Sequence, residues 1–234
     1  MSNLAVIVAA GSSRRMGFDK LRAELNHIPV LIHSLLAFER CEEVAGLVLV
    51  VATGQTGEFK DLARDYDIGK LVAVVEGGAD RCLSVWHGIR AAMEEAPDTE
   101  IILIHDGARP LVSDVAISLC IHKAREYGAA SLAHRVTDTL KRTDDLPLVG
   151  ESVDRDHLWA METPQAFEAG LIQRASRAAV DDSVIVTDEV SAVQRFDESQ
   201  RIFLVENPAP NPKITYPGDL AVAEALLRNG KHRT

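Results

Sequence analysis

The sequence predicts an α/β protein built on a doubly wound, mostly parallel sheet. Short apolar runs of four to six residues alternate with longer amphipathic segments. The runs are rich in Val, Ile and Leu, which is typical of strands buried on both faces of a parallel sheet. They lie at residues 4–8, 47–52, 71–75 and 101–104. Strands and helices that alternate in this way form right-handed βαβ crossovers.

The amphipathic segments predict the helices, because their apolar residues recur at spacings of three and four. Pro29 stands near the first helical position of the first segment, and Ser113 is placed to cap the fourth. A further short apolar run predicts a last strand at residues 201–205. We expect helices over residues 29–39, 58–66, 83–95, 114–127, 169–179, 188–194 and 217–227.

The segment 134–159 breaks this rhythm. It is polar, with Thr, Asp and Arg interspersed among Val and Leu. This pattern predicts an extended hairpin or arm that lies outside the central core. No repeat, low-complexity tract or linker divides the chain, so we expect one domain over residues 1–234.

Composition limits the possible partners and the compartment. The formal net charge of −10 disfavours binding to nucleic acid. The three cysteines form no C-x-x-C pair, which argues against a zinc site or a disulfide framework and suits a reducing cytoplasm. The apolar stretch 4–10 predicts a strand and not a signal peptide, and no run approaches the ~20 residues of a membrane helix. We therefore expect a cytoplasmic protein with no membrane or nucleic-acid partner.

The loop after the first strand, A-A-G-S-S-R-R-M-G-F-D-K at residues 9–20, is the strongest functional signal. Its small residues let backbone N–H groups approach an anion, and Gly11 allows a tight turn. Arg14, Arg15 and Lys20 add positive charge. At the carboxyl end of a first strand this loop predicts a polyphosphate cradle, although it matches neither the Walker A nor the G-x-G-x-x-G motif. The alternative is a tight turn with solvated cations.

Asp106 follows the fourth strand and is expected to project into the same crevice. A lone carboxylate there suits Mg²⁺, which commonly takes one or two carboxylates together with phosphate oxygens. The alternatives are a helix cap or an ion pair with Arg109. We expect the neighbouring His105 to be a buried histidine with a backbone partner, in preference to a catalytic base.

Gly77 and Gly78 follow the third strand, where a backbone free of side chains can approach a flat base. The alternative is an ordinary turn in which Asp80 caps the next helix. Alone this signal is weak, and its place at the same edge of the sheet strengthens it.

Three further polar residues carry no functional signal by themselves. Thr187 is expected to cap a helix, although a helix N-terminus also attracts phosphate. Arg155 lies between two aspartates, which predicts a surface ion pair of little energetic value. The alternative is that Arg155 reaches a neighbouring subunit. Lys213 is unremarkable alone.

Seven short motifs are spread along the chain: A-A-G-S-S-R-R-M-G at 9–17, G-G-x-x-R-x-x-S-V at 77–85, H-D-G-A-R-P at 105–110, V-D-R at 153–155, T-P-Q at 163–165, T-D-E at 187–189 and K-I-T at 213–215. In this order and spacing they resemble the motifs of the 2-C-methyl-D-erythritol 4-phosphate cytidylyltransferases of the non-mevalonate isoprenoid pathway. The resemblance spans nearly the whole chain. It implies a single Rossmann-like domain, a homodimer formed through a protruding β-arm at about residues 134–160, and transfer of the cytidylyl group of CTP to 2-C-methyl-D-erythritol 4-phosphate.

The resemblance also implies roles for individual residues. Arg15 and Lys20 match the positions that hold the CTP triphosphate, and Asp106 matches the ligand of Mg²⁺ or another divalent cation. The positions of the cytidine pocket match Ala9, Ala10, Gly11, Gly77, Gly78 and Ser84. The positions that hold methylerythritol phosphate match Arg109, Thr139, Arg155, Thr187 and Lys213, with Thr139 and Arg155 reaching across the dimer. The catalytic set implied in this way is Arg15, Lys20, Arg155 and Lys213.

Two points stay open from the sequence. The family commonly has Pro before the loop lysine and Gln after it, where this chain has Asp19 and Leu21, and the loop is shorter than in many members. The negative charge of Asp19 would weaken the binding of phosphate by Lys20 unless the Asp19 side chain points away.

The alternatives to the implied function are a cytidylyltransferase for another polyol phosphate, such as ribitol 5-phosphate, and a nucleotide-binding module without turnover.

Overall fold

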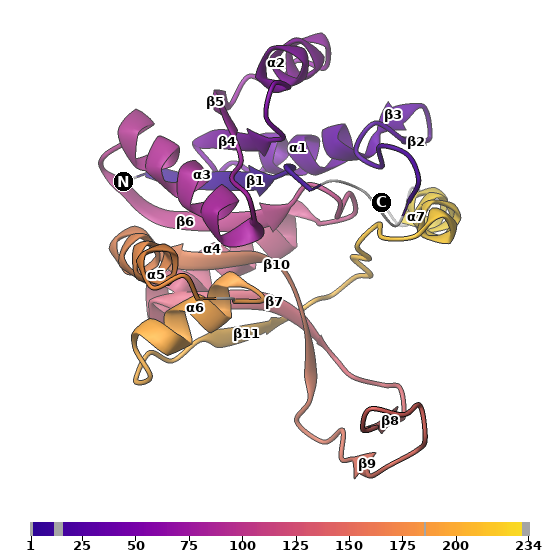
Figure 1. Ribbon diagram of the computed structural model, residues 1–234. Coiled ribbons are helices and arrows are strands. Elements are labelled where there is room, and N and C mark those ends of the chain that lie inside the picture. The colour runs from indigo at the N-terminus through magenta and orange to yellow at the C-terminus, as the bar shows by residue number, and fades with distance from the viewer. Residues whose placement is uncertain (1, 12–15, 185, 231–234) are drawn as a thin grey trace.

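A computed structural model describes residues 2–11, 16–184 and 186–230. One seven-stranded sheet runs through the molecule in the order β11-β7-β10-β6-β1-β4-β5 (Figure 1). Four parallel strands form one side of it: β1 (Ser2–Val8), β4 (Gly46–Val51), β5 (Leu71–Glu76) and β6 (Thr99–Asp106). These confirm the four apolar runs predicted as strands.

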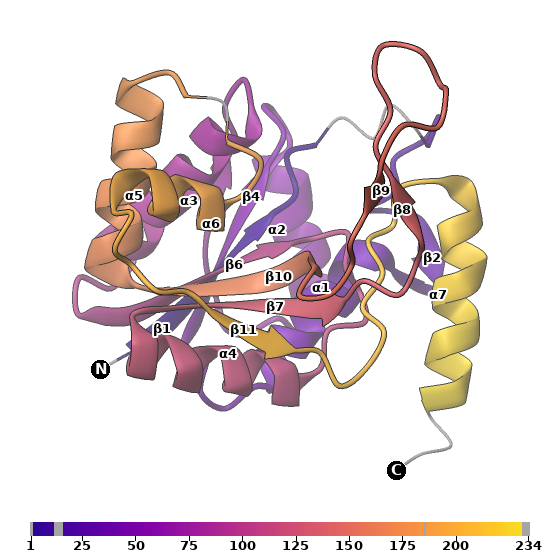
Figure 2. The ribbon, with the colours of Figure 1, turned by 90° about the horizontal axis from the view of Figure 1, so that it is seen from below.

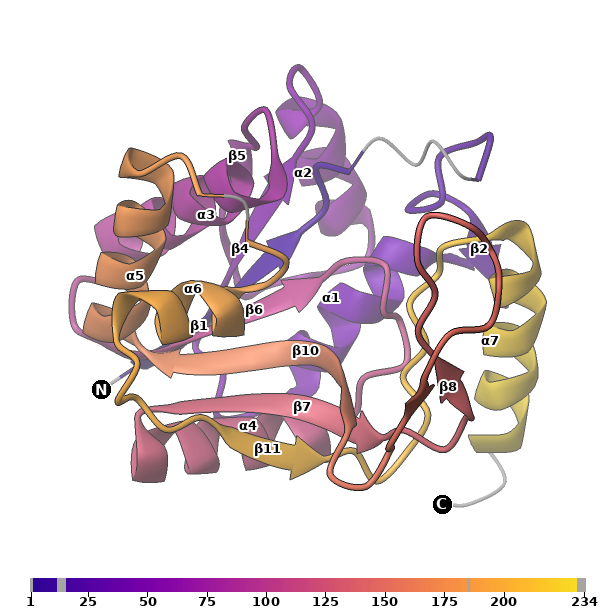
Figure 3. The same cartoon turned by 60° about the horizontal axis from the view of Figure 1, so that its bottom comes forward.

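The other side of the sheet comes from the second half of the chain. It contains β7 (Ala129–Arg135), β10 (Trp159–Glu168) and β11 (Phe203–Glu206). β10 lies antiparallel between β6 and β7, and β11 lies parallel to β7 (Figure 3). β7 and β10 were not predicted from the sequence, because β7 is rich in alanine and β10 buries Glu162, Thr163 and Gln165. Neither strand therefore has the apolar pattern of a core strand.

The arm lies between these two strands. Residues 136–158 leave the sheet and carry only two short paired strands, β8 (Leu140–Lys141) and β9 (Ser152–Val153). Figure 1 shows the arm extending away from the body of the molecule. The expected arm is confirmed, and its two ends are continuous with the central strands β7 and β10.

Helices cover both faces of the sheet (Figure 2). α3 (Arg81–Glu95), α5 (Ala169–Asp181) and α6 (Glu189–Phe196) enclose one hydrophobic core with the sheet. α1 (Val30–Arg40), α2 (Thr56–Asp65) and α4 (Asp114–Tyr127) enclose the other. α7 (Pro217–Gly230) packs beside the small hairpin of β2 (Glu24–Leu25) and β3 (Ile28–Pro29). Every helix predicted from the sequence is present, and Ser113 caps α4 by accepting a hydrogen bond from the N–H of Ala116 at 3.2 Å.

Gly88 lets α3 lie close against the sheet. A Cβ atom at this position would stand 2.3 Å from Cγ1 of Val6 in β1 and 2.7 Å from Cγ2 of Val50 in β4. Both distances are far below van der Waals contact, so a larger residue would push the helix away. Gly88 therefore helps to set the position of α3 over the carboxyl halves of β1 and β4.

Within the described residues, no helix is long and apolar enough to cross a membrane.

We predict that Gly88→Ala lowers the free energy of unfolding by about 1–3 kcal/mol, the usual cost of overpacking a core. Gly57→Ala in α2 is the matched control, because a Cβ atom there meets nothing within 4 Å. The control is expected to leave stability unchanged or to raise it, since alanine favours helix more than glycine. Urea denaturation measures both variants, and equal midpoints would contradict the packing argument.

Candidate active site

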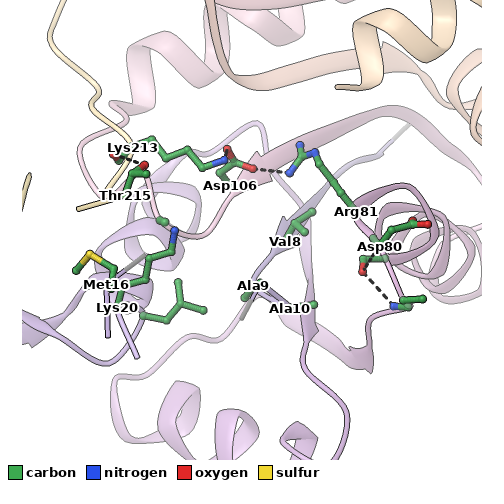
Figure 4. Close-up of a pocket in the computed structure, with 16 residues that line it drawn as sticks. Val8, Ala9, Ala10, Met16, Lys20, Asp80, Arg81, Asp106, Lys213 and Thr215 are labelled. Carbon is green, nitrogen blue, oxygen red and sulfur yellow. Dashed lines mark hydrogen bonds and ion pairs between the residues drawn. The ribbon is translucent and has the colours of Figure 1, made fainter. Parts of the chain in front are cut away.

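A cavity of about 660 Å³ opens at the carboxyl ends of β1 and β6 (Figure 4). The register of the two strands pairs Val8 with Asp106, so the chain leaves both strands at the same level. Ligands of open α/β sheets bind in crevices at this edge. The lining residues are Val8, Ala9, Ala10, Gly11, Met16, Lys20, Leu21, Gly78, Ala79, Asp80, Arg81, Ser84, Asp106, Ala108, Lys213 and Thr215.

One wall of the cavity is made of two closely packed backbone segments, residues 9–11 after β1 and residues 77–78 after β5. A Cβ atom on Gly77 would lie 2.5 Å from Cβ of Ala10 and 2.8 Å from Oγ of Ser84, so only glycine permits this approach. The N–H of Gly78 donates to Oγ of Ser84 at 3.0 Å, and that hydroxyl donates to the carbonyl of Asp80 at 2.7 Å. This wall therefore presents mainly backbone and small side chains at Ala9, Ala10, Gly11 and Gly78, which suits contact with a flat ligand.

The side chain of Asp106 lies among three cations. Its Oδ1 accepts a hydrogen bond from Nη1 of Arg81 at 2.6 Å, and its Oδ2 lies 2.7 Å from Nζ of Lys213 and 3.8 Å from Nε of Arg109. Burial favours a raised pKa for this carboxyl, but the charges of Arg81 and Lys213 outweigh it and hold the pKa well below its usual range. Asp106 is therefore a carboxylate that binds cations from both sides.

Arg81 also binds a second carboxylate. Its Nη2 donates to Oε2 of Glu189, the first residue of α6, at 2.8 Å. Burial raises the pKa of the Glu189 carboxyl, and the charge of Arg81 offsets only part of that effect. Neither residue had a predicted role, although both lie inside motifs of the resemblance, G-G-x-x-R for Arg81 and T-D-E for Glu189.

Lys20 reaches the C-terminal segment across the cavity. Its Nζ donates to the carbonyl of Ile214 at 2.9 Å. Asp19 turns toward its own loop, since Oδ1 accepts from the N–H of Leu21 at 3.0 Å and Oδ2 pairs with Nε of Arg22 at 3.0 Å. The carboxylate beside Lys20 is thus bound locally. Arg15, the other cation implied for the triphosphate, lies outside the described residues.

Arg109 is largely buried and does not line the cavity. Nη1 donates to the carbonyl of Asn211 at 2.7 Å and Nη2 to that of Met161 at 3.4 Å. The residue thereby ties the segment before Lys213 to β10. In this structure its guanidinium donates hydrogen bonds to backbone carbonyls and also forms an ion pair with Asp106.

His105 is fully buried and neutral. Its Nε2 lies 3.2 Å from the carbonyl of Arg109, which can only accept, so this nitrogen carries the proton. Nδ1 then accepts from the hydroxyl of Thr163 at 3.0 Å, and that hydroxyl accepts from the N–H of Asp106 at 3.1 Å. Burial lowers the pKa of His105 to about 4. The predicted buried histidine with a backbone partner is confirmed.

The helix caps near the site differ in one case from the expectation. Asp80 caps α3, accepting from the N–H of Leu83 at 2.8 Å, as its alternative interpretation proposed. The prediction that Thr187 caps α6 is wrong. Asp188 is the cap, because its Oδ1 accepts from the N–H of Ser191 at 3.0 Å, and Thr187 is exposed beside it.

Thr139 and Arg155 lie on the arm, exposed and outside the cavity lining. Arg155 donates to the carbonyl of Thr137, and no ion pair forms between it and either flanking aspartate in the described structure. The interpretation of Arg155 as a simple surface ion pair is therefore wrong. Gly77 packs against Ala10 and Ser84 without lining the cavity itself. The arm residues lie apart from the cavity. The predicted residues that line it within one chain are Ala9, Ala10, Gly11, Gly78, Ser84, Lys20, Asp106 and Lys213.

Comparison with known proteins identifies the family. The family model described as 2-C-methyl-D-erythritol 4-phosphate cytidylyltransferase matches residues 3–229. The chain belongs to this family. Proteins of that name from Geobacillus kaustophilus and Desulforamulus reducens are 39% and 40% identical over 229 and 232 residues, covering 97% of each chain.

Solved structures agree with this assignment. The 4-diphosphocytidyl-2C-methyl-D-erythritol synthase of Anaerococcus prevotii is similar with a TM-score of 0.84 and 31% identity, over 97% of this chain and 96% of that one. The 2-C-methyl-D-erythritol 4-phosphate cytidylyltransferase of Thermus thermophilus gives 0.78 and 30%, over 97% and 100%. The predicted fold class and the resemblance are both confirmed.

We predict that His105 makes stability depend on pH. Its folded pKa of about 4 lies below the value of about 6.5 in the unfolded chain, so the unfolded state binds more protons between these values. The free energy of unfolding should therefore rise from pH 4 to pH 6.5 through this group. His105→Gln is expected to flatten the rise, measured by urea denaturation across that range. An identical slope in both proteins would contradict a buried neutral histidine.

Proposed function

We propose that this chain transfers the cytidylyl group of CTP to 2-C-methyl-D-erythritol 4-phosphate. The products are 4-diphosphocytidyl-2-C-methyl-D-erythritol and diphosphate, in the non-mevalonate route to isoprenoid precursors. Membership of the family supports the proposal. The single structural observation that carries it is Asp106, set between Arg81 and Lys213 at the carboxyl edge of the sheet.

The reaction needs charge neutralisation more than a base. An oxygen of the acceptor phosphate attacks the α-phosphorus of CTP, and the bond to the diphosphate leaving group breaks. A phosphate monoester with a second pKa of about 6 is largely dianionic at neutral pH, so it is already a nucleophile. His105 fits this scheme, because both its ring nitrogens are bound within the protein. Catalysis then depends on bringing two polyanions together and stabilising the charge that develops.

The nucleotide is proposed to lie along the glycine-rich wall. Its base contacts backbone at Ala9, Ala10, Gly11, Gly77 and Gly78, with Ser84 fixing the turn. Lys20 lies across the cavity and Arg15 belongs to the same loop, so both are proposed to bind the triphosphate and the leaving group.

Asp106 is proposed to hold Mg²⁺ or another divalent cation together with nucleotide phosphates. The described residues contain no cluster of three or more His, Cys, Asp or Glu side chains that could hold a metal unaided. A single carboxylate fits Mg²⁺ when phosphate oxygens and waters complete its octahedral shell. When bound, the ion would neutralise negative charge on the reacting phosphates.

The acceptor is proposed to lie on the side of Lys213. Lys213 is proposed to bind its phosphate, and the family pattern implies that Arg109 and Thr187 contribute to binding the same substrate. Thr139 and Arg155 lie on the protruding arm, so they would contribute to the site of a second copy in a homodimer.

We propose that residues 1–234 form one catalytic domain and that the arm at about residues 134–160 forms the dimer contact. We also propose that the enzyme works in the cytoplasm without membrane or nucleic-acid partners.

Release of diphosphate tests this function. Purified protein is mixed with CTP and Mg²⁺, and one polyol phosphate is added at a time. Methylerythritol phosphate should release diphosphate at the highest rate. Faster turnover with ribitol 5-phosphate would establish the other polyol cytidylyltransferase, and binding of CTP without release would indicate a non-catalytic module.

We predict that Lys20→Ala lowers kcat on the order of 10²-fold or more, the scale of losing one transition-state charge contact. Lys60→Ala is the control, because Lys60 is an exposed lysine of α2 outside the cavity. Steady-state kinetics at saturating CTP measure both variants. Near-wild-type turnover of Lys20→Ala would remove Lys20 from the catalytic set.

We predict that Arg155→Ala raises the KM for methylerythritol phosphate at least tenfold more than the KM for CTP. Arg142→Ala is the control, since Arg142 lies on the same arm and pairs with Glu151 at 2.8 Å. Sedimentation at micromolar concentration tests the dimer in parallel. Equal effects of Arg155→Ala on both KM values, or a monomeric wild-type protein, would contradict a site shared between two copies.

A further inference from the structure

A buried carboxylate outside the proposed catalytic set, that of Glu189, lies beside the site. Glu189 is 4% exposed, and glutamate is rarely buried so far unless it is paired. None of the roles proposed above for nucleotide, metal or acceptor uses it. The cost of burying this carboxylate must therefore be offset by a charged or hydrogen-bonding partner.

The start of α6 fixes the direction of Glu189. Gln165 of β10, which is 1% exposed, accepts a hydrogen bond from the N–H of Glu189 at 3.1 Å and donates to Oδ2 of Asp188 at 2.8 Å. In the sheet, Gln165 stands opposite Ile104 of β6, the strand that ends in Asp106. One rigid frame thus carries both carboxylates.

Arg81 spans the gap between these carboxylates. Its Nη1 donates to Asp106 at 2.6 Å and its Nη2 to Glu189 at 2.8 Å. The guanidinium is a rigid planar fork, so two partners on different elements fix both its position and its orientation. Arg81 lines the cavity, as Figure 4 shows, and its side chain is 28% exposed.

We propose that Glu189 is a positioning residue that anchors Arg81 at the wall of the cavity and limits its pairing with Asp106. The inference rests on the proposed function, in which Asp106 must offer an oxygen to a cation and phosphates. Without Glu189, Asp106 would be the carboxylate partner left to Arg81 among the described residues. With Glu189, the guanidinium keeps its place when Asp106 changes partners, and its charge stays beside the nucleotide.

Equilibrium binding of CTP in the presence of Mg²⁺ tests the anchor. Glu189→Gln keeps the size of the side chain and removes its charge, and it is expected to raise the Kd for CTP about tenfold. Because Glu189 acts through Arg81, the same substitution should add no further loss in an Arg81→Gln background. Glu43→Gln is the control and should leave the Kd unchanged, because the Glu43 carboxylate also pairs with an arginine, Arg125 at 3.5 Å, and neither residue lines the cavity.

A second measurement needs no nucleotide. Side-chain ¹⁵N NMR of arginine, with Arg81→Gln assigning the signal, should show hindered rotation of the Arg81 guanidinium in the wild-type protein and faster rotation in Glu189→Gln. An unchanged Arg81 signal, or an equal loss of CTP affinity in both backgrounds, would overturn the proposal. A wild-type protein that bound no CTP would overturn the proposed function instead, and the NMR result would still decide the role of Glu189.

Discussion

The cation cluster around Asp106 is the interaction on which the site depends. One buried carboxylate meets Arg81, Lys213 and Arg109, which come from the third helix, the C-terminal segment and the loop after β6. Such an arrangement is stable because the cations offset the cost of burying the carboxylate. It also concentrates positive charge at the edge of the sheet where the proposed function brings two phosphate-bearing substrates together. The same contacts that hold the site together are thus the ones a polyanionic ligand would replace.

The fold brings these residues together through the register of the sheet. Val8 and Asp106 are paired, so the glycine-containing loop and the carboxylate leave their strands side by side. Gly88 seats α3 against β1 and β4, which sets the position of Arg81 at the start of that helix. On the other side, β10 connects the sheet to α6 through Gln165. The antiparallel strand β10 therefore positions residues of the site as well as forming part of the core.

Much of this was predictable from the sequence, and the exceptions have physical causes. Apolar runs and amphipathic spacing predicted β1, β4, β5, β6 and the helices, because those elements bury one continuous apolar face or stripe. β10 escaped prediction because it buries Glu162 and Gln165, whose polar groups are satisfied only by partners distant in sequence. The bridge from Arg81 to Glu189 escaped for the same reason, since 108 residues separate its ends. The positions of Asp106 and of the backbone wall at residues 9–11 and 77–78 were predictable because the ends of parallel strands meet at one edge.

We expect Asp106 to exchange its protein cations for a cation bound to the nucleotide. Calorimetric titration of CTP at increasing Mg²⁺ tests it most directly, with the wild-type protein compared with Asp106→Asn. Mg²⁺ should raise the affinity of the wild-type protein for CTP at least tenfold, and the affinity of Asp106→Asn should not respond. An equal response to Mg²⁺ in both proteins would contradict it.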